Sequence, residues 1–354
     1  MSGDPVRQRR PRYPGKYPRR FEQRYKELQG DPETLGKVLS AGKTPAGSHV
    51  PVLLQETLDV LRPKPGDIVV DCTLGRGGHT RALLKAIQPG GRLLALDADP
   101  LELPRTEACL RAEGWSPECF QASRSNFAGL SAALVDWGCP QVDVLLADLG
   151  VSSMQLDDPV RGFTSKFEGP LDMRLNPSRG VTAAEWIART PVHRMAVCFQ
   201  KNADEPRASE LALALAGKMF STTSDLSRAI RAALPNRPAE EVEKSIRRVF
   251  QSVRIAVNEE FSALDALLRQ IPGCLKPGGR AALISFHSGE DRRVKMAFQC
   301  GLREGHYAEI ARDVLRASPS ERRSNPRSTP AKLRWAMVAS CVSNLPLPPS
   351  STSV

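Results

Sequence analysis

The stretch VVDCTLGRGGHT, residues 69–80, joins a run of β-branched residues to a glycine-rich turn. A strand that enters such a turn and then a helix directs backbone N–H groups toward a ligand, and glycine permits close approach. Asp97 ends the next apolar run, at the distance expected of a carboxylate that binds ribose hydroxyls. These residues predict a site for a cofactor that contains a nucleoside.

The positions of the glycines distinguish between two such cofactors. The dinucleotide fingerprint is G-x-G-x-x-G, whereas Gly75, Gly77 and Gly78 are followed here by Thr80 at the third place. S-adenosylmethionine needs a ribose-binding acid and a backbone cradle but no pyrophosphate site, so the loop favours this cofactor. A purely structural glycine turn is the alternative, and His79 alone is more readily a packing residue at a helix start than an acid or base.

Asp148 is the second candidate acid, in the stretch DLGVSSMQLD, residues 148–157. It ends the fourth apolar strand pattern of the chain. In an open α/β sheet the ligand lies across the carboxyl ends of the strands, so Asp148 is expected to face the same crevice as the glycine loop. The alternative is an aspartate that only caps the turn after its strand.

Strand and helix patterns alternate from residue 49 onward, which indicates a parallel sheet covered by helices. The expected strands are 67–72, 92–99, 117–123, 143–150 and 279–288, and the helices between the first four are 80–87, 101–114 and 127–138.

About 130 residues separate the last two expected strands, far more than one crossover helix needs. Residues 182–270 carry helical patterns, so an inserted helical domain is the economical explanation. The expected organisation is a disordered basic arm (1–48), the first part of the main domain (49–157), the insertion (158–254), the second part of the main domain (255–341) and a flexible tail (342–354).

The net charge of +11 and the pI near 9.5 indicate a polyanionic partner. The charge is uneven, because residues 1–30 hold nine Lys or Arg against three acids, and residues 311–334 hold seven against two. Each run is expected either to contact RNA or to be a solvated surface. No apolar run is long enough to span a bilayer, so a membrane protein is not expected.

The cysteines and histidines give no spacing typical of a metal site. The eight cysteines include no CxxC pair and the five histidines are dispersed, so we expect no metal and a reducing compartment. The first 27 residues have no apolar core, and prolines interrupt them, so they predict a disordered basic arm rather than a leader. A cytoplasmic location is expected.

Several segments resemble the bacterial ribosomal RNA small subunit methyltransferase H family, also called MraW, in order and spacing. The resemblance runs from His49 to about Ala339. The segments are HVPVLLQETLDVL, DCTLGRGGHT, LDADP, DLGVSSMQLDDPVRGFTSKFEGPLDMRLNPSRGVTAAEWI, FQSVRIAVNEE, GGRAALISFHSGEDRRVK and NPRSTPAKLR.

This resemblance implies an S-adenosylmethionine-dependent enzyme with a Rossmann-like class I methyltransferase sheet and an inserted all-helical domain that helps recognise RNA. Its substrate would be the exocyclic N4 of a cytidine in small-subunit rRNA near the ribosomal P site. The implied partner is this rRNA or the assembling small subunit, and the oligomeric state is left open, a homodimer included. A non-catalytic ribosome-assembly factor on the same fold is the alternative, whereas the missing third glycine disfavours a nicotinamide oxidoreductase.

The family's cofactor contacts fall on seven residues of this chain, namely Gly77, Gly78, His79, Asp97, Phe127, Asp148 and Gln155. For the chemistry, we expect Asp148 or a carbonyl of the LGVSS turn to accept a hydrogen bond from the amine, while Ser152 and Ser153 shape the pocket. His287 is a candidate for proton removal or for contact with the base. The alternative is that His287 only begins a helix, which Ser288 caps.

The chain departs from the family pattern at three places. Gly289 stands where a leucine is usual, QKNADEPRAS (200–209) replaces a segment such as YGEERFAK, and most members lack the arm. Arginines around the insertion could bind phosphates or form a solvated surface, and Asp172 could pair with Arg174. These arginines are Arg161, Arg174, Arg247, Arg248 and Arg254.

Overall fold

The computed structural model describes residues 51–340 apart from 153, 154 and 157. The predicted arm, the predicted tail and Ser153 lie outside the described residues.

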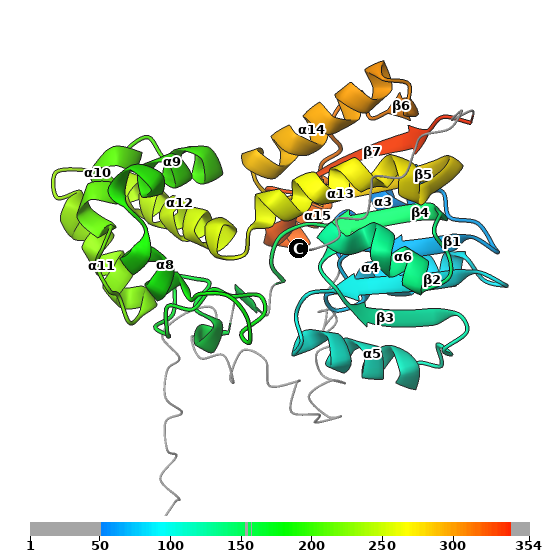
Figure 1. Ribbon diagram of the computed structural model, residues 1–354, viewed down its shortest axis with the longest axis horizontal. Coiled ribbons are helices and arrows are strands. Elements are labelled where there is room, and N and C mark those ends of the chain that lie inside the picture. The colour runs from blue at the N-terminus through cyan, green and yellow to red at the C-terminus, as the bar shows by residue number, and fades with distance from the viewer. Residues whose placement is uncertain (1–50, 153–154, 157, 341–354) are drawn as a thin grey trace, which may run out of the picture. The chain divides into compact units, whose positions relative to one another are not determined.

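A seven-stranded sheet forms the centre of the fold, in the order β3-β2-β1-β4-β5-β7-β6 (Figure 1). The first five strands are parallel, and β7 runs antiparallel to both of its neighbours. The predicted α/β class is thereby confirmed, although β6 and β7 were not predicted. The bounds are β1 Ile68–Asp71, β2 Arg92–Asp97, β3 Phe120–Arg124, β4 Val142–Asp148, β5 Leu275–Ser285, β6 Tyr307–Ile310 and β7 Lys332–Val338.

Helices cover both faces of this sheet, because parallel strands are apolar on both sides. One face packs against α6 (Leu130–Asp136), α13 (Glu260–Cys274) and α14 (Ser288–Arg303). The other face packs against α3 (Leu54–Leu61), α4 (Gly78–Ala86) and α5 (Glu102–Ala112). Among the described residues, no helix has the length and apolar character needed to cross a membrane.

Between β4 and α13 the chain folds into helices that share a hydrophobic core of their own. The helix α12 ends at Val257, three residues beyond the predicted boundary at 254, and Asn258 marks this end. The Asn258 side chain accepts a hydrogen bond from the Leu175 N–H and donates to the Met173 carbonyl. The elements are η3 Pro159–Arg161, α8 Ala183–Arg189, α9 Val192–Ala203, α10 Ala208–Leu215, α11 Thr223–Ala233 and α12 Ala239–Val257.

Candidate functional site

Three parallel strands end in aspartates at one edge of the sheet, which we call the carboxyl edge. Asp71 ends β1, Asp97 ends β2 and Asp148 ends β4. Because β2 and β4 both pair with β1, the strand order reverses direction here, and such a point is where open α/β sheets bind ligands. The structure thus brings the two predicted acids together and adds Asp71.

Asp97 fastens the glycine loop to the end of β2. Its two carboxylate oxygens accept hydrogen bonds from the backbone N–H groups of Gly75 and Asp99, each at 2.9 Å. Gly75 has a φ of +48°, and a Cβ on it would meet only a carbonyl at 3.9 Å, so this side of the loop is open. The loop and its acid therefore leave room for a ligand at the carboxyl edge.

Gly77 and Gly78 differ from Gly75 because they pack closely against other parts of the fold. A Cβ on Gly77 would lie 3.1 Å from Cγ2 of Thr106, and one on Gly78 would lie 3.2 Å from Cβ of Pro51. Gly77 also has a φ of +71°, which disfavours other residues. Packing within the turn therefore accounts for Gly77 and Gly78, whereas the Cβ position of Gly75 borders open space.

His79 lies in the first turn of α4, buried beside Asp148. Its Nε2 is 3.0 Å from the Val52 carbonyl, which can only accept, so this nitrogen carries a hydrogen. Its Nδ1 faces the Asp148 carboxylate, 3.7 Å from Oδ2. The other oxygen of Asp148, Oδ1, is enclosed and makes no hydrogen bond with the residues that the structure describes. Because the Asp148 side chain is 27% exposed, the carboxylate borders accessible space.

The aspartates at the carboxyl edge favour a cationic ligand. Burial raises the pKa of Asp71 and, together with the charges of Asp99 and Asp71, raises the pKa of Asp97 to about 6. Burial and the charges of Asp71 and Glu290 raise the pKa of Asp148 well above its ordinary value. In the described part of the chain, no Lys or Arg pairs with Asp71, Asp97 or Asp148. The positive charge of a sulfonium is favoured beside these carboxylates, whereas the negative charge of a pyrophosphate is not.

Cofactor affinity is expected to depend on pH through Asp97. Only the ionised carboxylate accepts freely from ribose hydroxyls, and without ligand its pKa is about 6. Affinity for S-adenosylmethionine should therefore be constant above pH 7 and fall below pH 6, by at most about tenfold per pH unit. Calorimetry between pH 5 and 8 checks this. An equally steep fall in Asp97→Asn would exclude Asp97 as the titrating group.

Gln155 and Arg161 meet at Asp99, which is 1% exposed. The Gln155 amide donates to Asp99 Oδ2 at 2.7 Å, and Arg161 donates to the same oxygen at 2.9 Å. Gln155 also accepts from the backbone N–H of Ser152, whose hydroxyl accepts from the Gln155 N–H. These contacts hold the segment after β4 against the end of β2. Asp99 was missed in the sequence because its partner Arg161 lies 62 residues away.

Several arginines considered as phosphate ligands are paired inside the protein. Arg161 binds Asp99, and Arg174 donates to Asp172 at 2.7 Å, which confirms the predicted pairing of these two residues. Arg254 binds both carboxylate oxygens of Glu260. Arg161, Arg174 and Arg254 are therefore committed to internal carboxylates.

Phe127 follows β3 at the same edge of the sheet. It begins the short helix η2 (Phe127–Gly129), which Asn126 caps by accepting from the Ala128 N–H. The ring is half-buried and packs against the core beneath α6. This placement is compatible with a side chain that borders the cofactor crevice.

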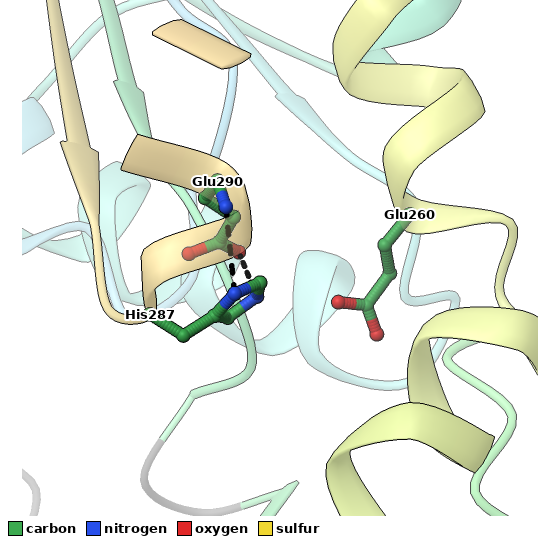
Figure 2. Close-up of side chains that lie close together, drawn as sticks. All are labelled: Glu260, His287 and Glu290. Carbon is green, nitrogen blue, oxygen red and sulfur yellow. Dashed lines mark hydrogen bonds and ion pairs between the residues drawn. The ribbon is translucent and has the colours of Figure 1, made fainter. Parts of the chain in front are cut away.

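His287 caps α14, and its two ring nitrogens face Glu290 (Figure 2). Nδ1 accepts from the Glu290 backbone N–H at 3.4 Å, and Nε2 lies 3.2 Å from the Glu290 carboxylate. Burial opposes ionisation of Glu290, but the hydrogen bond and charge of His287 hold its pKa below the ordinary value. The expected cap, Ser288, is instead the first residue of the helix. To accept a substrate proton at Nδ1, His287 would have to release this capping contact.

Glu260 approaches the same histidine from α13 (Figure 2). Glu260, His287 and Glu290 each offer a ligand atom within 4.8 Å of the others, an arrangement that could hold a metal ion. The Arg254 guanidinium already binds Glu260 at 2.8 and 2.9 Å, however, and supplies the positive charge that a metal would. The two glutamates were not predicted as site residues, although the H-x-x-E spacing of a helix start is a recognisable signal.

Chelation is expected to leave the protein unchanged, because Arg254 neutralises Glu260 and His287 binds Glu290. The melting temperature and the affinity for S-adenosylmethionine, measured before and after dialysis against EDTA, should agree within error. A lower melting temperature that added zinc restores would instead show that this cluster binds a metal.

Gly289 has a structural explanation in this chain. A Cβ at this position would lie 2.6 Å from Cζ of Phe261, so the phenyl ring occupies the space that a leucine side chain would need. The Phe261 ring also lies 5.7 Å from the His287 ring and 3.6 Å beneath the guanidinium of Arg293. In this chain the phenyl ring of Phe261 therefore fills the space beside His287 that a side chain at position 289 would occupy.

The segment QKNADEPRAS also forms internal contacts. Arg207 pairs with Glu241 at 2.7 Å. The neighbouring Glu205 is 2% exposed and accepts from the Ser245 hydroxyl and the Arg207 N–H. Arg207 therefore pairs with a carboxylate inside the helical region.

A cavity of about 820 Å³ lies away from these residues. It is lined by side chains of α6, α13, α14 and β6, including Leu268, Met296 and Tyr307. None of the predicted site residues lines it. The candidate site is therefore the carboxyl edge and not this cavity.

The chain is similar to known proteins in sequence. Residues 46–339 match the model of the MraW methylase family. Ribosomal RNA small subunit methyltransferase H 1 of Agathobacter rectalis is 41% identical over 96% of this chain and 100% of its own length. Ribosomal RNA small subunit methyltransferase H 2 of Alkaliphilus metalliredigens is 43% identical over 94% of this chain and 98% of its own length.

Solved structures resemble the chain only distantly. A SAM-dependent O-methyltransferase from Thermotoga maritima has a TM-score of 0.38 and 12% identity, over 82% of this chain and 66% of its own. An rRNA methylase from Streptococcus thermophilus has a TM-score of 0.37 and 12% identity, over 81% and 93%. The assignment of the sheet rests on its own strand order.

Proposed function

Because the chain belongs to the MraW methylase family, we propose that it methylates the exocyclic N4 of a cytidine in small-subunit rRNA, near the ribosomal P site. S-adenosylmethionine is the cofactor, as the sequence predicted, and when bound it supplies an electrophilic methyl group. The family relationship supports the rRNA substrate, and the site residues support the chemistry at the amine.

One observation carries the proposal, namely the Asp148 carboxylate at the end of β4, which borders accessible space and pairs with no Lys or Arg among the described residues. Burial raises the pKa of this carboxyl, so a donor from a ligand would stabilise its ionised form. The exocyclic amine of cytosine offers such a donor. Asp148 therefore fits the role of the acceptor that orients the amine.

Three residues at the carboxyl edge have different proposed roles. Asp97 holds the glycine loop by two backbone hydrogen bonds and is proposed to accept from the cofactor ribose. Phe127 is proposed to border the adenine. Asp148 is proposed to bind one amine N–H, which aligns the nitrogen lone pair and prepares the proton for departure. Alignment of this kind can lower a barrier by about 7 to 11 kcal/mol.

Gln155, Ser152 and His287 have supporting parts in this proposal. Gln155 and Ser152 hold the turn after Asp148 through reciprocal hydrogen bonds. His287 holds the start of α14 and the buried Glu290. His287 is therefore proposed to shape the pocket, and Asp148 to meet the amine.

The proposed setting is the cytoplasm, with small-subunit rRNA or the assembling small subunit as partner. An assembly factor without catalysis would not need a carboxylate that borders accessible space beside a cofactor loop. The match to its curated relatives covers nearly their full length, which supports the same activity in this chain.

Transfer of the methyl group tests the proposal directly. Purified protein, small-subunit RNA and S-adenosylmethionine carrying an isotopically labelled methyl group should yield N4-methylcytidine after nucleoside digestion and mass spectrometry. RNA in which the target cytidine is replaced by uridine is the matched control. Label in another nucleoside, or equal label in the control, would contradict the assignment.

A further inference from the structure

The connection between β6 and β7, residues 311–331, is a cationic surface that the proposed chemistry does not use. Five arginines lie in it against Asp313 and Glu321. Its helical elements are α15 (Pro319–Ser324) and η4 (Pro326–Ser328). Four exposed arginines have side chains that form no ion pair or hydrogen bond with the described residues, namely Arg312, Arg316, Arg322 and Arg323.

Other cations close to this connection are paired, which sets these arginines apart. Lys332 and Arg334, just beyond it, bind the two oxygens of Asp291 at 2.9 and 2.7 Å. Within the connection, the Glu321 carboxylate accepts from the Leu53 backbone N–H. Asp313 is exposed, and it is the only other acid within residues 311–331. The surface therefore keeps a net positive charge.

Strand pairing places this connection at the carboxyl edge. Lys332, the first residue of β7, pairs with Ser285, the last residue of β5. Leu315 forms a bridge with Leu333, so the chain that leaves β6 runs along β7 to the same edge. On the other side of β5, Ile284 pairs with Asp148. The arginines after Leu315 are therefore carried on the edge that holds the candidate site.

Two hydrogen bonds connect the surface with that site through adjacent residues. The Val52 carbonyl accepts from His79, which faces Asp148, and the Leu53 N–H donates to Glu321 of α15. Val52 and Leu53 also share a hydrophobic cluster with Ala317, Ile284 and Leu333. The cationic surface is thus held in a fixed place beside the candidate site.

From this arrangement we infer that Arg316, Arg322 and Arg323 bind backbone phosphates of the RNA that flanks the methylated nucleotide. Guanidinium groups bind phosphate oxygens through two parallel hydrogen bonds, and unpaired ones need not first break an ion pair. The inference rests on the proposed function for the identity of the RNA. A membrane is the less suitable polyanion, because no large exposed hydrophobic side chain lies in residues 311–331 to enter a bilayer.

The salt dependence of RNA binding tests this surface. The triple variant R316Q/R322Q/R323Q removes three cations from the carboxyl edge. The control K64Q/K85Q/R303Q removes three exposed cations from other parts of the main domain. Binding of a small-subunit rRNA fragment is measured by fluorescence anisotropy between 0.05 and 0.3 M KCl. We expect the slope of log K against log salt to become shallower by about two to three in the triple variant, and affinity to fall about tenfold to a hundredfold near 0.1 M salt.

Two further readouts separate phosphate binding from a structural role. The variant R316K/R322K/R323K keeps the charge and should retain most of the wild-type salt slope. Affinity for S-adenosylmethionine and the melting temperature should be unchanged in all three proteins, because the altered side chains are exposed. With saturating RNA, the triple variant should keep its kcat while its KM for RNA rises by the same factor as Kd.

The phosphate surface and the proposed function can fail independently of each other. A triple variant that matches wild type, or a control that loses as much, overturns the phosphate surface. Weaker binding to anionic phospholipid vesicles with RNA affinity unchanged overturns it too, in favour of a membrane surface. If wild-type protein binds RNA but forms no N4-methylcytidine, the proposed function fails, and the salt slopes still test the surface.

Discussion

Asp148→Asn is expected to lower turnover by about a hundredfold or more while the affinity for S-adenosylmethionine stays within about threefold of wild type. The substitution keeps the shape of the side chain but removes its negative charge. The Asp148 carboxylate pairs with no Lys or Arg among the described residues, so the substitution leaves no buried cation unpaired. An amide in this place would also present a donor to the amine in one of its two orientations.

Single-turnover kinetics with saturating RNA and cofactor measure this effect without a contribution from product release. Calorimetry measures cofactor affinity on the same preparation. The matched control is Asp136→Asn, the same change at an exposed position that ends α6. Wild-type turnover in Asp148→Asn would remove this residue from the mechanism. Equal losses of turnover and affinity would make it a cofactor ligand only.

Asp97→Ala is expected to weaken S-adenosylmethionine by about a hundredfold or more. The change removes the acceptor proposed for the ribose and also releases the backbone N–H groups of Gly75 and Asp99. Each hydrogen bond to a charged group contributes about 1.5 to 3 kcal/mol, so one such bond to the cofactor already accounts for tenfold to a hundredfold. Loss of the loop anchor adds to this.

Calorimetric titration of Asp97→Ala and Asp97→Asn distinguishes the two contributions. The asparagine keeps an acceptor for one backbone N–H, so its loss of affinity should be smaller than that of the alanine. Glu113→Gln is the control, because Glu113 lies beyond the end of α5 and pairs with Arg81 at the surface. Affinity within twofold of wild type in Asp97→Ala would show that the cofactor does not bind this acid.

The part of the fold that carries the site could be predicted from the sequence, because local patterns specify it. The first four strands are short apolar runs with helical patterns between them, and Asp97 and Asp148 stand where such runs end. The two terminal strands were missed for physical reasons. β6 has exposed residues at its two central positions and so forms no apolar run, and β7 does not alternate regularly between buried and exposed positions.

The contacts that hold the site could not be predicted, because they join residues far apart in the sequence. Arg161 lies 62 residues from Asp99. Glu260 and His287 meet only after α13, β5 and α14 have packed together. The explanation of Gly289 is of the same kind, because the space it leaves is filled by Phe261 from another helix.

The most direct test of the central claim is nucleoside mass spectrometry of small-subunit rRNA from cells that lack this protein. N4-methylated cytidine should be absent from the mapped site, return when the wild-type chain is expressed, and stay absent when Asp148→Asn is expressed at the same level. N4-methylated cytidine that persists unchanged in the deletion strain would contradict the proposed function.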